Sequence, residues 1–571
     1  MHTTLKQKIS EALKELEINE IDFVVEHPAE VGHGDYSTNV ALVAAKTLRQ
    51  AQGEKSDESP RELAERIKTV LLEYKMENVE KIEVAGAGFI NFFLSQDYFV
   101  GVVEDILKKS DLYGRNGKLM GRKVMIEYTD LNPFKLAHIG HLMSNAIGES
   151  LSRIMQFCGA GVIRATYQGD VGLHIAKAIW GKIQKQDITS GRAYSYGHEK
   201  YETDERAKTE IDEINKKAYS RSDEQINKIY DEGRGASLAE FEKIYEKLGT
   251  KFDKYYFESE MAKSGIEMVK GNTPGIFEES EGAIVFHGEK YDPSLHTRVF
   301  ITKASLPTYE AKDIALAKRK FEDENPDLSI VVTGNEQKDY YRVVIKALSL
   351  IREDWSAKTL HVTHGMLRLP TGKMGSRKGN VITVESLIAD VEKLAQEKMN
   401  TSTHLSDDEK NSVATDIAVG AIKYSILKQQ TGKDIIFDFD KSLSFEGDSG
   451  PYLQYTFARA QSVLSKAKEL EMLATWSPTV AMSLDEVGQV EKLLERFPGE
   501  VGRAFEEYAP QRIVTYLTEL ASAFNSYYAA NKIVDFDNED VSGYRLAVTL
   551  ATSVVLKNGL WLLGIKAPER M

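Results

Sequence analysis

Residues 124–159 read VMIEYTDLNPFKLAHIGHLMSNAIGESLSRIMQFCG, and they indicate the architecture more clearly than any other segment. The opening VMIEYTD is an apolar run typical of a buried strand, and LNPFKLA after it is predicted to be a loop. A long helix is predicted to begin near His138 and to end at Gly159. The apolar residues that support this helix recur at helical spacing: Leu142, Ile147, Leu151, Ile154 and Met155.

The chain beyond this helix repeats the same pattern. VIRATYQGD at 162–170 is predicted to be a strand, and AKAIW at 176–180 lies on a predicted helix. Strand, helix and strand in this order indicate a parallel sheet, so the expected fold class is α/β. Downstream, the sheet pattern is predicted to resume in the runs GAIVF, TRVFITK, LSIVVTGN and KTLHVTHGMLRL.

Changes in pattern divide the chain into three predicted domains. Residues 1–115 read as a small mixed unit of helices and strands, closed by a turn-like YGRNGKLMGRK. Residues 116–390 carry the sheet, with a charged stretch near 195–265 that is predicted to be a solvated helical insertion without chemistry of its own. Residues 391–571 are predicted to be mostly helical.

Composition limits the possible classes of protein. The 571 residues include 73 Lys and Arg against 87 Asp and Glu, a net charge of −14 that argues weakly against a non-specific nucleic-acid binder. With 42% hydrophobic residues the chain can bury several cores, which excludes wholesale disorder. Its single cysteine, Cys158, excludes an intrachain disulfide and favours a reducing, cytoplasmic location. We expect neither a signal peptide nor a membrane span.

The first candidate site is the tetrapeptide His138-Ile139-Gly140-His141 at the predicted helix start. Helix N-termini attract phosphate, and two imidazole groups beside a small Gly140 suit a triphosphate. Two other interpretations stay open, a buried histidine pair or two ligands of a metal ion. No acidic or cysteine side chain stands nearby at the usual metal spacing, which weakens the metal alternative.

The second candidate is GKMGSRKGN at 372–380, in which three glycines alternate with the cations Lys373, Arg377 and Lys378. A positive glycine-rich loop can close on developing phosphate charge, although such a turn is usually no more than solvated surface. The chain has neither G-x-x-x-x-G-K-[ST] nor G-x-G-x-x-G, so the usual P-loop and dinucleotide fingerprints are absent.

These two segments resemble the HIGH and KMSKS signatures of class I aminoacyl-tRNA synthetases. EYTDLNPFKLAHIGHL, YQGDVGLHIAKAIW, LPTYEAKD, GNEQ, PYLQYTFARAQSVL and LLGIKAPERM narrow the resemblance to the arginyl-tRNA synthetases. HGDYSTNVAL and GAGFINFFL resemble the extra N-terminal domain of that family. The resemblance implies a Rossmann-like parallel-sheet catalytic domain, a small α+β N-terminal domain that binds the tRNA elbow, and an all-α C-terminal domain that binds the anticodon.

The resemblance also implies the chemistry and its residues. Arginine, ATP with Mg²⁺ and tRNA(Arg) are the expected substrates, and no protein-held metal is expected. The implied catalytic residues are Lys135, His138, His141 and Lys373. The implied ATP-binding residues are His138, Gly140, His141, Lys373, Met374, Ser376 and Lys378. Gly375 and Ser376 stand where the class usually has Ser and Lys, and Lys135 is expected to compensate for the missing lysine.

Family matching assigns a second set of residues to arginine and a third to tRNA. The implied arginine-binding residues are Glu127, Asn132, His141, Tyr309, Asp313 and Gln337. Tyr309 and Asp313 lie four apart on a predicted helix, so the carboxylate and the ring share a face that suits a guanidinium, although a solvated pair is the alternative. The implied tRNA-binding residues are Phe89, Asn91, Tyr452, Gln454, Tyr455, Arg459 and Met571.

The resemblance further implies a monomer in which tRNA is needed for arginine activation. Two rivals are another HIGH-motif synthetase and a non-catalytic tRNA-binding paralogue. A third, a metal hydrolase that uses His138 and His141, predicts activity without ATP.

Overall fold

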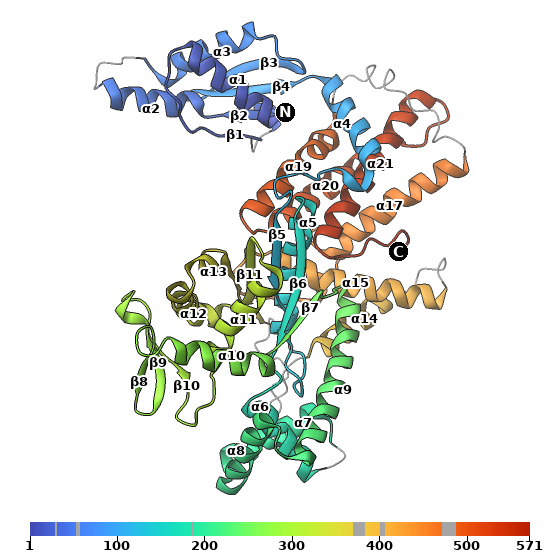
Figure 1. The fold of residues 1–571 in the computed structure, drawn as a ribbon. Coiled ribbons are helices and arrows are strands. Elements are labelled where there is room, and N and C mark those ends of the chain that lie inside the picture. Colours follow the sequence, from blue (N-terminus) through green and yellow to red (C-terminus); the bar gives the residue numbers. More distant parts are fainter. Residues whose placement is uncertain (29–30, 53–57, 186–187, 369–382, 400–405, 471–486) are drawn as a thin grey trace. The chain divides into compact units, whose positions relative to one another are not determined.

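The structure is a computed structural model that describes residues 1–571 except 29–30, 53–57, 186–187, 369–382, 400–405 and 471–486 (Figure 1). The chain forms two compact units. Unit 1 comprises residues 1–111, 463–496 and 526–554, and unit 2 comprises residues 112–462, 497–525 and 555–571. Among the helices of the described residues, none is long and apolar enough to cross a membrane.

The N-terminal part of unit 1 is a four-stranded antiparallel sheet packed against helices, as the sequence predicts for a small mixed domain. The strand order is β1-β2-β4-β3, and Figure 1 shows the helices lying along the sheet. The strands are β1 (Val25–Glu26), β2 (Tyr36–Thr38), β3 (Val79–Ala85) and β4 (Phe89–Leu94). The helices are α1 (His2–Glu15), α2 (Val40–Gln52), α3 (Pro60–Glu73) and α4 (Gln96–Lys109).

Buried polar groups of unit 1 join this sheet to residues 463–496. The Glu495 carboxylate accepts hydrogen bonds from the hydroxyl groups of Tyr36, at 2.6 Å, and Tyr98, at 3.0 Å. Lys492 forms a 2.9 Å ion pair with Asp35, whose other oxygen accepts the Leu94 N–H. These bonds connect the sheet to α19 (Gln489–Glu506) within unit 1.

Unit 2 is built on the predicted parallel sheet, with five strands in the order β12-β11-β5-β6-β7. The strands are β5 (Lys123–Glu127), β6 (Gly161–Gln168), β7 (Lys254–Phe257), β11 (Leu328–Gly334) and β12 (Thr359–His364). The chain leaves β5 towards β6 on one side, and β11 joins β5 on the other side. In open parallel sheets such a switch point forms a crevice at the carboxyl ends of the strands.

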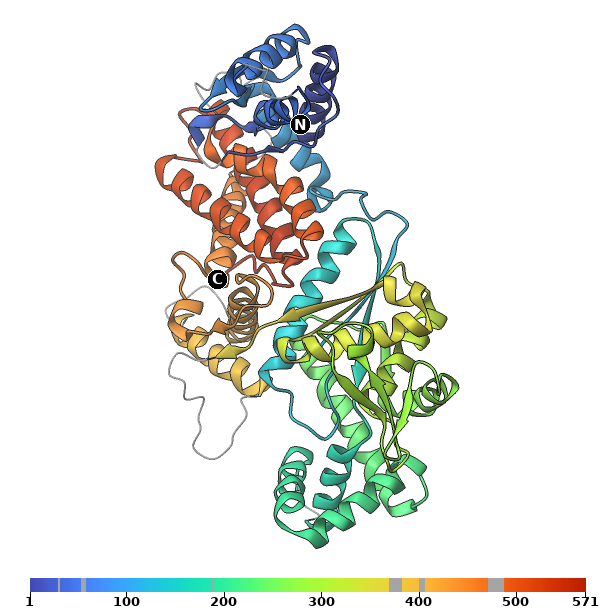
Figure 2. The same cartoon turned by 90° about the vertical axis from the view of Figure 1, so that its left-hand side faces the viewer.

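Helices cover both faces of this sheet (Figure 2). The predicted helix from the opening segment is α5 (Ile139–Phe157), and Gly159 follows it with φ +98°, which a glycine adopts readily. On the opposite face lie α10 (Glu258–Gly271) and α11 (Tyr309–Glu324), and Ala315 and Leu316 of α11 pack against Met125 of β5 and Ala165 of β6. The central strands are thus buried on both faces, which explains their continuous apolar runs.

Two expectations about the middle of the chain are wrong. The residues near 195–265 are not only helical, because β7 at 254–257 is a strand of the main sheet. The helices of this region are α7 (Ser190–Thr203), α8 (Glu205–Ser220) and α9 (Glu224–Leu248), and the predicted helix around AKAIW precedes them as α6 (Leu173–Gln184). GAIVF and TRVFITK do not continue the parallel sheet. Together with β8 (Glu278–Ser280) they form a separate antiparallel sheet, as β9 (Ala283–His287) and β10 (Thr297–Ile301).

The elements after β11 follow in helix and strand order. η5 (Asn335–Gln337) leads into α12 (Lys338–Ile351), α13 (Glu353–Ala357) comes before β12, and β13 (Leu367–Arg368) pairs in parallel with β14 (Ile435–Ile436). From residue 384 onward the described chain is mainly helical, as predicted. Its helices are α14 (Val384–Met399), α15 (Asp407–Leu427), α16 (Phe439–Ser442), α17 (Gly450–Glu469), α19 (Gln489–Glu506), α20 (Gln511–Ala530) and α21 (Glu539–Leu562).

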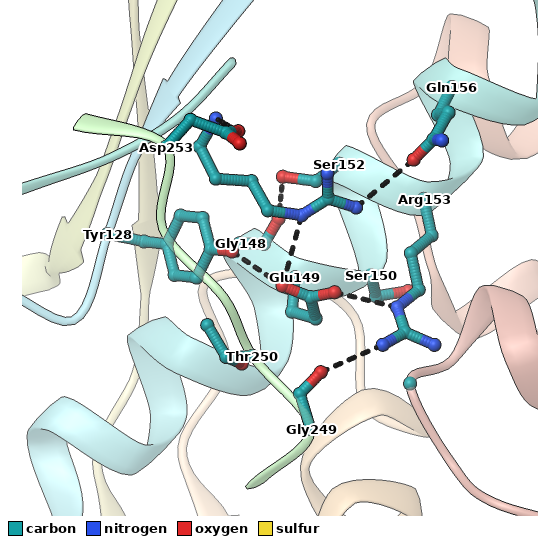
Figure 3. Close-up of polar contacts among 12 residues, drawn as sticks. Tyr128, Gly148, Glu149, Ser150, Ser152, Arg153, Gln156, Gly249, Thr250 and Asp253 are labelled. Carbon is teal, nitrogen blue, oxygen red and sulfur yellow. Dashed lines mark hydrogen bonds and ion pairs between the residues drawn. The ribbon is translucent and has the colours of Figure 1, made fainter. Parts of the chain in front are cut away.

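A buried polar network holds α5 in unit 2 (Figure 3). Glu149, 2% exposed, accepts hydrogen bonds from Tyr128 at 2.6 Å, Arg153 at 2.7 Å and Arg164 at 3.3 Å. Arg153 also donates to the backbone oxygens of Trp561 and Gly249. Burial raises the pKa of Glu149, but Arg153 and Arg164, together with the Tyr128 hydroxyl and Lys423, hold the pKa below its usual value.

Candidate active site

The crevice at the carboxyl ends of β5, β6 and β11 contains a pocket of about 430 Å³. Its position at the switch point of the strand order is where open α/β sheets bind ligands. Most of its lining side chains are polar or charged. They are Glu127, Asp130, Asn132, Lys135, Tyr167, Glu258, Arg298, Tyr309, Asp313, Thr333, Glu336, Gln337, Tyr340 and Tyr341, and the backbone of Gly169 completes the wall.

The two predicted histidines lie at the N-terminus of α5, and their own helix fixes their tautomers. The Nδ1 atom of His138 accepts the Gly140 N–H, and the Nδ1 atom of His141 accepts the His138 N–H, each at 3.1 Å. Because both Nδ1 atoms accept, a neutral ring carries its proton on Nε2. The two rings stack with their centroids 3.8 Å apart.

Both rings are held in the neutral form. Burial lowers the pKa of His138, and the positive charge of Lys135 lowers it further. Burial lowers the pKa of His141 well below its usual value, with smaller effects from His138 and Lys135. Each ring therefore offers one Nε2–H donor beside the positive end of the helix dipole, an arrangement that suits phosphate oxygens.

Lys135 lies on the loop that joins β5 to α5, as the sequence predicts. Its ammonium lies 5.2 Å from the centre of the Tyr194 ring, and burial lowers its pKa. Three non-glycine residues of this loop have positive φ, Thr129 at +79°, Asp130 at +39° and Phe134 at +66°. Backbone strain of this kind costs about 1–3 kcal/mol per residue and collects at functional sites.

Two of the pocket's carboxylates are neutralised by lysines of α11. Glu127 forms an ion pair of 2.5 Å with Lys320, and Glu258 forms one with Lys312. All four side chains are at most 6% exposed. The charge predicted to meet the substrate at Glu127 is therefore already matched within the protein.

Asp313 differs from those two acids because its described partner is a neutral hydroxyl. Tyr340 donates a 2.6 Å hydrogen bond to it, and no ion pair joins Asp313 to any of the described cations. Burial raises the pKa of Asp313 to about 8, and the nearby charges of Glu127 and Glu258 raise it as well. Tyr309 lies one turn earlier on α11 and is 53% exposed. The predicted pair thus lines the pocket as an acid with no ion pair among the described residues, beside an exposed ring whose centre lies 4.5 Å from the Lys312 ammonium.

The other predicted arginine-binding residues are placed unequally. Asn132 and Gln337 line the pocket. A Cβ atom at Gly169 would stand 2.2 Å from the Asn132 Oδ1 atom, so only glycine lets this amide lie against the strand end. His141 is absent from the lining and lies at the start of α5 instead.

The predicted glycine-rich loop, with Lys373, Met374, Ser376 and Lys378, falls at 369–382, outside the described residues. The first described residues after this loop contact the segment that contains the histidines. Thr383 forms an isolated β-bridge with His138, and the Val384 N–H donates to the Ala137 oxygen at 2.9 Å.

The predicted tRNA-binding residues of unit 1 lie on β4. Phe89 is 41% exposed, whereas Asn91 is buried and accepts a 2.7 Å hydrogen bond from the Ser37 hydroxyl. Of this pair, only Phe89 has a side chain that is exposed in unit 1.

The predicted tRNA-binding residues of unit 2 lie on α17 and at residue 571. Gln454 is fully buried, and its amide donates to the backbone oxygens of Asp416 and Lys566. Tyr452 and Arg459 both hydrogen-bond Asn525. Tyr455 is 37% exposed, and the Arg459 guanidinium lies 4.9 Å from its ring centre. Met571 is partly exposed.

The structure adds lining residues that sequence reasoning did not select. Arg298 of β10 donates to Glu310 at 3.0 Å and lies 5.1 Å from the Tyr340 ring. Asp130 stands inside the opening segment, but an aspartate in a loop usually indicates only a turn. Its burial and its backbone strain emerge only in the folded chain. Glu258 and Lys312 could not be paired before the fold placed α10 beside α11.

Comparisons with known proteins agree along the whole chain. Residues 102–439 match the catalytic-domain model of the class I tRNA synthetases (R), residues 3–94 match the arginyl tRNA synthetase N-terminal domain, and residues 453–571 match the DALR anticodon-binding domain. The arginine–tRNA ligase of Halothermothrix orenii is 32% identical over 99% of this chain and 98% of its own length. That of Clostridium acetobutylicum is 32% identical over 98% and 97%.

Solved structures show the same fold. The arginyl-tRNA synthetase of Thermus thermophilus superposes with a TM-score of 0.78 at 24% identity, covering 100% of both chains. That of Plasmodium falciparum superposes with a TM-score of 0.79 at 20% identity, covering 100% of this chain and 99% of its own. From the ordered site residues and these matches together, the chain belongs to the arginyl-tRNA synthetases, a class I aminoacyl-tRNA synthetase family.

Proposed function

We propose that this chain ligates L-arginine to tRNA(Arg) at the expense of ATP, through an arginyl-adenylate. The observation that carries the proposal is a pocket acid with no ion pair among the described residues, Asp313, together with two neutral imidazoles at the N-terminus of α5, the helix that follows the pocket's own loop. The first suits a guanidinium and the second suits phosphate.

In the first step the arginine carboxylate attacks the α-phosphorus of ATP. A new oxygen–phosphorus bond forms, the bond to the β-phosphate oxygen breaks, and pyrophosphate leaves. The carboxylate is ionised at neutral pH, so this step needs no general base. In the second step the terminal 2′-hydroxyl of tRNA attacks the carbonyl carbon, AMP leaves, and the hydroxyl proton is released.

The protein's part in the first step is positioning and charge compensation. The Nε2–H groups of His138 and His141 donate to phosphate oxygens, and the Gly140 backbone leaves room for the nucleotide. Lys135 and the loop residues Lys373, Met374, Ser376 and Lys378 bring further donors to the phosphates. ATP enters as its Mg²⁺ complex, in which the ion neutralises phosphate charge.

Arginine is recognised through its guanidinium. The two oxygens of Asp313 accept paired N–H bonds, which lysine's single ammonium cannot match in the same plane. Tyr309 offers its ring face to the cation, and Gln337 and Asn132 add neutral polar contacts. Glu127 contributes through its ion pair with Lys320, which keeps the pocket wall rigid.

The three predicted domains, 1–115, 116–390 and 391–571, then share the work on tRNA. We assign the elbow contact to the first, with Phe89 and Asn91, and the anticodon contact to the last, with Tyr452, Gln454, Tyr455, Arg459 and Met571. An exposed aromatic ring suits stacking on an unpaired base. We also propose that tRNA is needed for arginine activation, and that the protein acts as a monomer in the cytoplasm.

The test is ATP–pyrophosphate exchange with each amino acid, with and without tRNA(Arg). We expect exchange only when arginine and tRNA are both present. Exchange with arginine alone would remove the tRNA requirement, and exchange only with another amino acid would overturn the substrate. His141→Ala should abolish exchange and leave tRNA binding intact. His296→Asn, on an exposed loop residue, is the matched control and should leave both unchanged.

A further inference from the structure

We propose that one face of α9, formed by Tyr230, Gly233, Arg234 and Ser237, positions two walls of the arginine pocket, the loop between β5 and α5 and the start of α10. The inference rests on the proposed function. It gives a role to the charged insertion near 195–265, for which the sequence predicts no chemistry. Within the described pocket, none of these four residues lines the wall. They act on arginine through the residues that they hold, so they are positioning residues.

The spacing of these residues places them on one side of the helix. Positions i, i+3, i+4 and i+7 share a face of an α-helix, and 230, 233, 234 and 237 fit that spacing. Tyr230, Gly233 and Ser237 are buried and Arg234 is partly buried, whereas Gly235 between them is exposed. The four residues therefore form one continuous stripe that neighbouring segments cover.

The first wall is the loop between β5 and α5, and α9 holds this loop at Phe134. The Ser237 hydroxyl accepts the Phe134 N–H at 3.0 Å and donates to the Gly233 oxygen at 2.9 Å. The Phe134 ring lies directly on Gly233, where a Cβ atom would stand 2.2 Å from a ring carbon. The φ of Phe134 is +66°, a strained value that is maintained only where the surroundings require it. Asn132 and Lys135 flank this residue and both line the pocket, so their positions depend on α9.

The second wall is the start of α10, and α9 holds it through Asp170. The Asp170 side chain is fully buried. It accepts hydrogen bonds from the Tyr230 hydroxyl and the Arg234 guanidinium of α9, each at 3.0 Å. It also accepts the N–H and the hydroxyl of Ser259 on α10, at 2.9 Å and 2.8 Å. One carboxylate thus joins α9 to the first turn of α10.

Asp170 and Ser259 each adjoin a residue of the pocket. Gly169 precedes Asp170, Glu258 precedes Ser259, and both Gly169 and Glu258 line the pocket. A Cβ atom at Gly169 would stand 3.0 Å from a Glu258 carboxylate oxygen, so these two parts of the wall are in close contact. Glu258 is ion-paired with Lys312 of α11. A displacement of α9 therefore reaches α11 through Asp170 and this ion pair.

The charge of Arg234 makes this connection sensitive to α9. Arg234 forms a 3.0 Å ion pair with Asp170, and its guanidinium lies 4.0 Å from the ring centre of Phe257, the residue before Glu258. Removing one partner of a buried charge pair leaves the other charge unmatched, so the surrounding wall must rearrange. A pocket that aligns two reacting groups tolerates little rearrangement, because a displacement of about 1 Å far from the chemistry can cost about 100-fold in rate.

Two glycines of α9 give a matched pair of variants in the full-length chain. Gly233→Ala places a methyl group against the Phe134 ring, whereas a Cβ atom at Gly235 meets no atom within 4 Å. Both changes raise the helix propensity alike. Arginine affinity is measured by calorimetry, and KM for arginine and ATP by ATP–pyrophosphate exchange, all with tRNA(Arg) present. We expect Gly233→Ala to weaken arginine about 10–100-fold and Gly235→Ala to leave its affinity unchanged.

A rescue variant separates positioning from a general loss of structure. Phe134→Leu removes the ring atoms that the new methyl group would meet. Gly233→Ala combined with Phe134→Leu should therefore bind arginine within about threefold of Phe134→Leu alone, a non-additive effect expected only of residues in contact.

The two polar contacts of α9 should change different kinetic constants. Ser237→Ala leaves the Phe134 N–H without its acceptor, so KM should rise for both arginine and ATP, because Asn132 and Lys135 flank Phe134. Arg234→Gln removes the ion pair of Asp170 and should raise KM for arginine about three- to tenfold with little change for ATP. The second wall leads through Lys312 to Tyr309, whose ring centre lies 4.5 Å from the Lys312 ammonium.

Three results would overturn the inference. One is a Gly233→Ala variant that binds arginine as tightly as Gly235→Ala does. Another is a weakened Gly233→Ala variant that Phe134→Leu does not rescue. The third, which decides the matter should Gly233→Ala not fold, is an unchanged KM for arginine in both Ser237→Ala and Arg234→Gln. A wild type that exchanges only with another amino acid overturns the proposed substrate instead, and the same variants are then compared with that amino acid.

Discussion

Unit 2 contains two acidic centres, which differ in how the negative charge of the carboxylate is balanced. At Glu149, on α5, the carboxylate meets two guanidinium groups and a tyrosine hydroxyl. At Asp313, on α11, a carboxylate of the pocket meets only a tyrosine hydroxyl among the described residues. Both sites pair an acid with a tyrosine hydroxyl, and they differ in whether the described part of the protein supplies a paired cation.

That difference separates structure from binding. Burial alone raises a carboxylate's pKa at either centre, but Arg153 and Arg164 reverse the effect at Glu149. Nothing comparable reverses it at Asp313, whose pKa rises to about 8. A compensated charge holds α5 in place, whereas an uncompensated charge is stabilised only when a cationic ligand arrives. We therefore propose that the centre at Asp313 is the one that binds a ligand.

The largest effect is expected from Asp313→Asn. The change removes the paired acceptors of the guanidinium, and loss of one partner of a buried charge pair costs about 3–5 kcal/mol. We therefore expect kcat/KM for arginine in ATP–pyrophosphate exchange to fall by about 10²–10⁴-fold, at 1.36 kcal/mol per factor of ten. Thermal stability should be unchanged or slightly higher, because the free protein loses a buried carboxylate.

Glu149→Gln should reverse that pattern. An amide cannot match two guanidinium groups, so Arg153 and Arg164 are left buried with unpaired charge, at a cost of about 3 kcal/mol or more in the free energy of unfolding. Chemical denaturation measures this loss. Arginine affinity of the folded variant should stay within about threefold of the wild type. A variant that keeps its stability and loses arginine would contradict the division between the two centres.

The sequence alone predicts most of the strands and helices around these two centres. The apolar runs of β5, β6 and β11 are long enough to indicate buried parallel strands, and glycine marks the end of α5. β7 was missed because KYYF is only four residues long and lies among charged helices. β9 and β10 were assigned to the main sheet because the hydrophobic pattern of a strand does not identify its partner.

The site divides in the same way. His138 and His141 can be predicted because their role depends on a local pattern, a loop followed by a helix N-terminus. The ion pairing of Glu127 cannot, although Glu127 lies in the same segment as His138. Its lysine partner comes from α11, nearly 200 residues later. A local sequence pattern therefore predicts a phosphate-binding site more readily than it predicts which acidic side chains lack a cationic partner.

The pH dependence of arginine binding is the next test, with a smaller effect. Because the pKa of Asp313 is raised to about 8, the free pocket holds a proton that bound arginine displaces. As the pH rises towards 8, the dissociation constant of arginine should therefore fall by about tenfold per pH unit. Above pH 8 it should level off. Calorimetry in buffers of different ionisation enthalpy measures the released proton directly.

The charged and titratable neighbours of Asp313 define the controls for that test. They are Glu127 and Lys312 with Glu258, Asp130 on the β5 loop, and the tyrosines Tyr340 and Tyr341 of α12. Asp130 can add a second proton, since its pKa is raised too. His138 and His141 have lowered pKa values, so they do not gain charge as the pH falls to 7. A pH-independent affinity between pH 6 and 8 would show that Asp313 is already ionised in the free pocket.

The smallest effects come from removing one tyrosine hydroxyl at each centre, which is the most closely matched comparison. Tyr128→Phe deletes one of the three donors to Glu149, and we expect a loss of about 1 kcal/mol in the free energy of unfolding with arginine affinity unchanged. Tyr340→Phe deletes the hydrogen bond that lowers the pKa of Asp313, so arginine affinity at pH 7 should fall by severalfold. Denaturation and calorimetry on both variants measure the free energy of unfolding and the arginine affinity for each centre. If both variants lose only stability, Asp313 is as much a structural group as Glu149, and the contrast between the two centres is wrong.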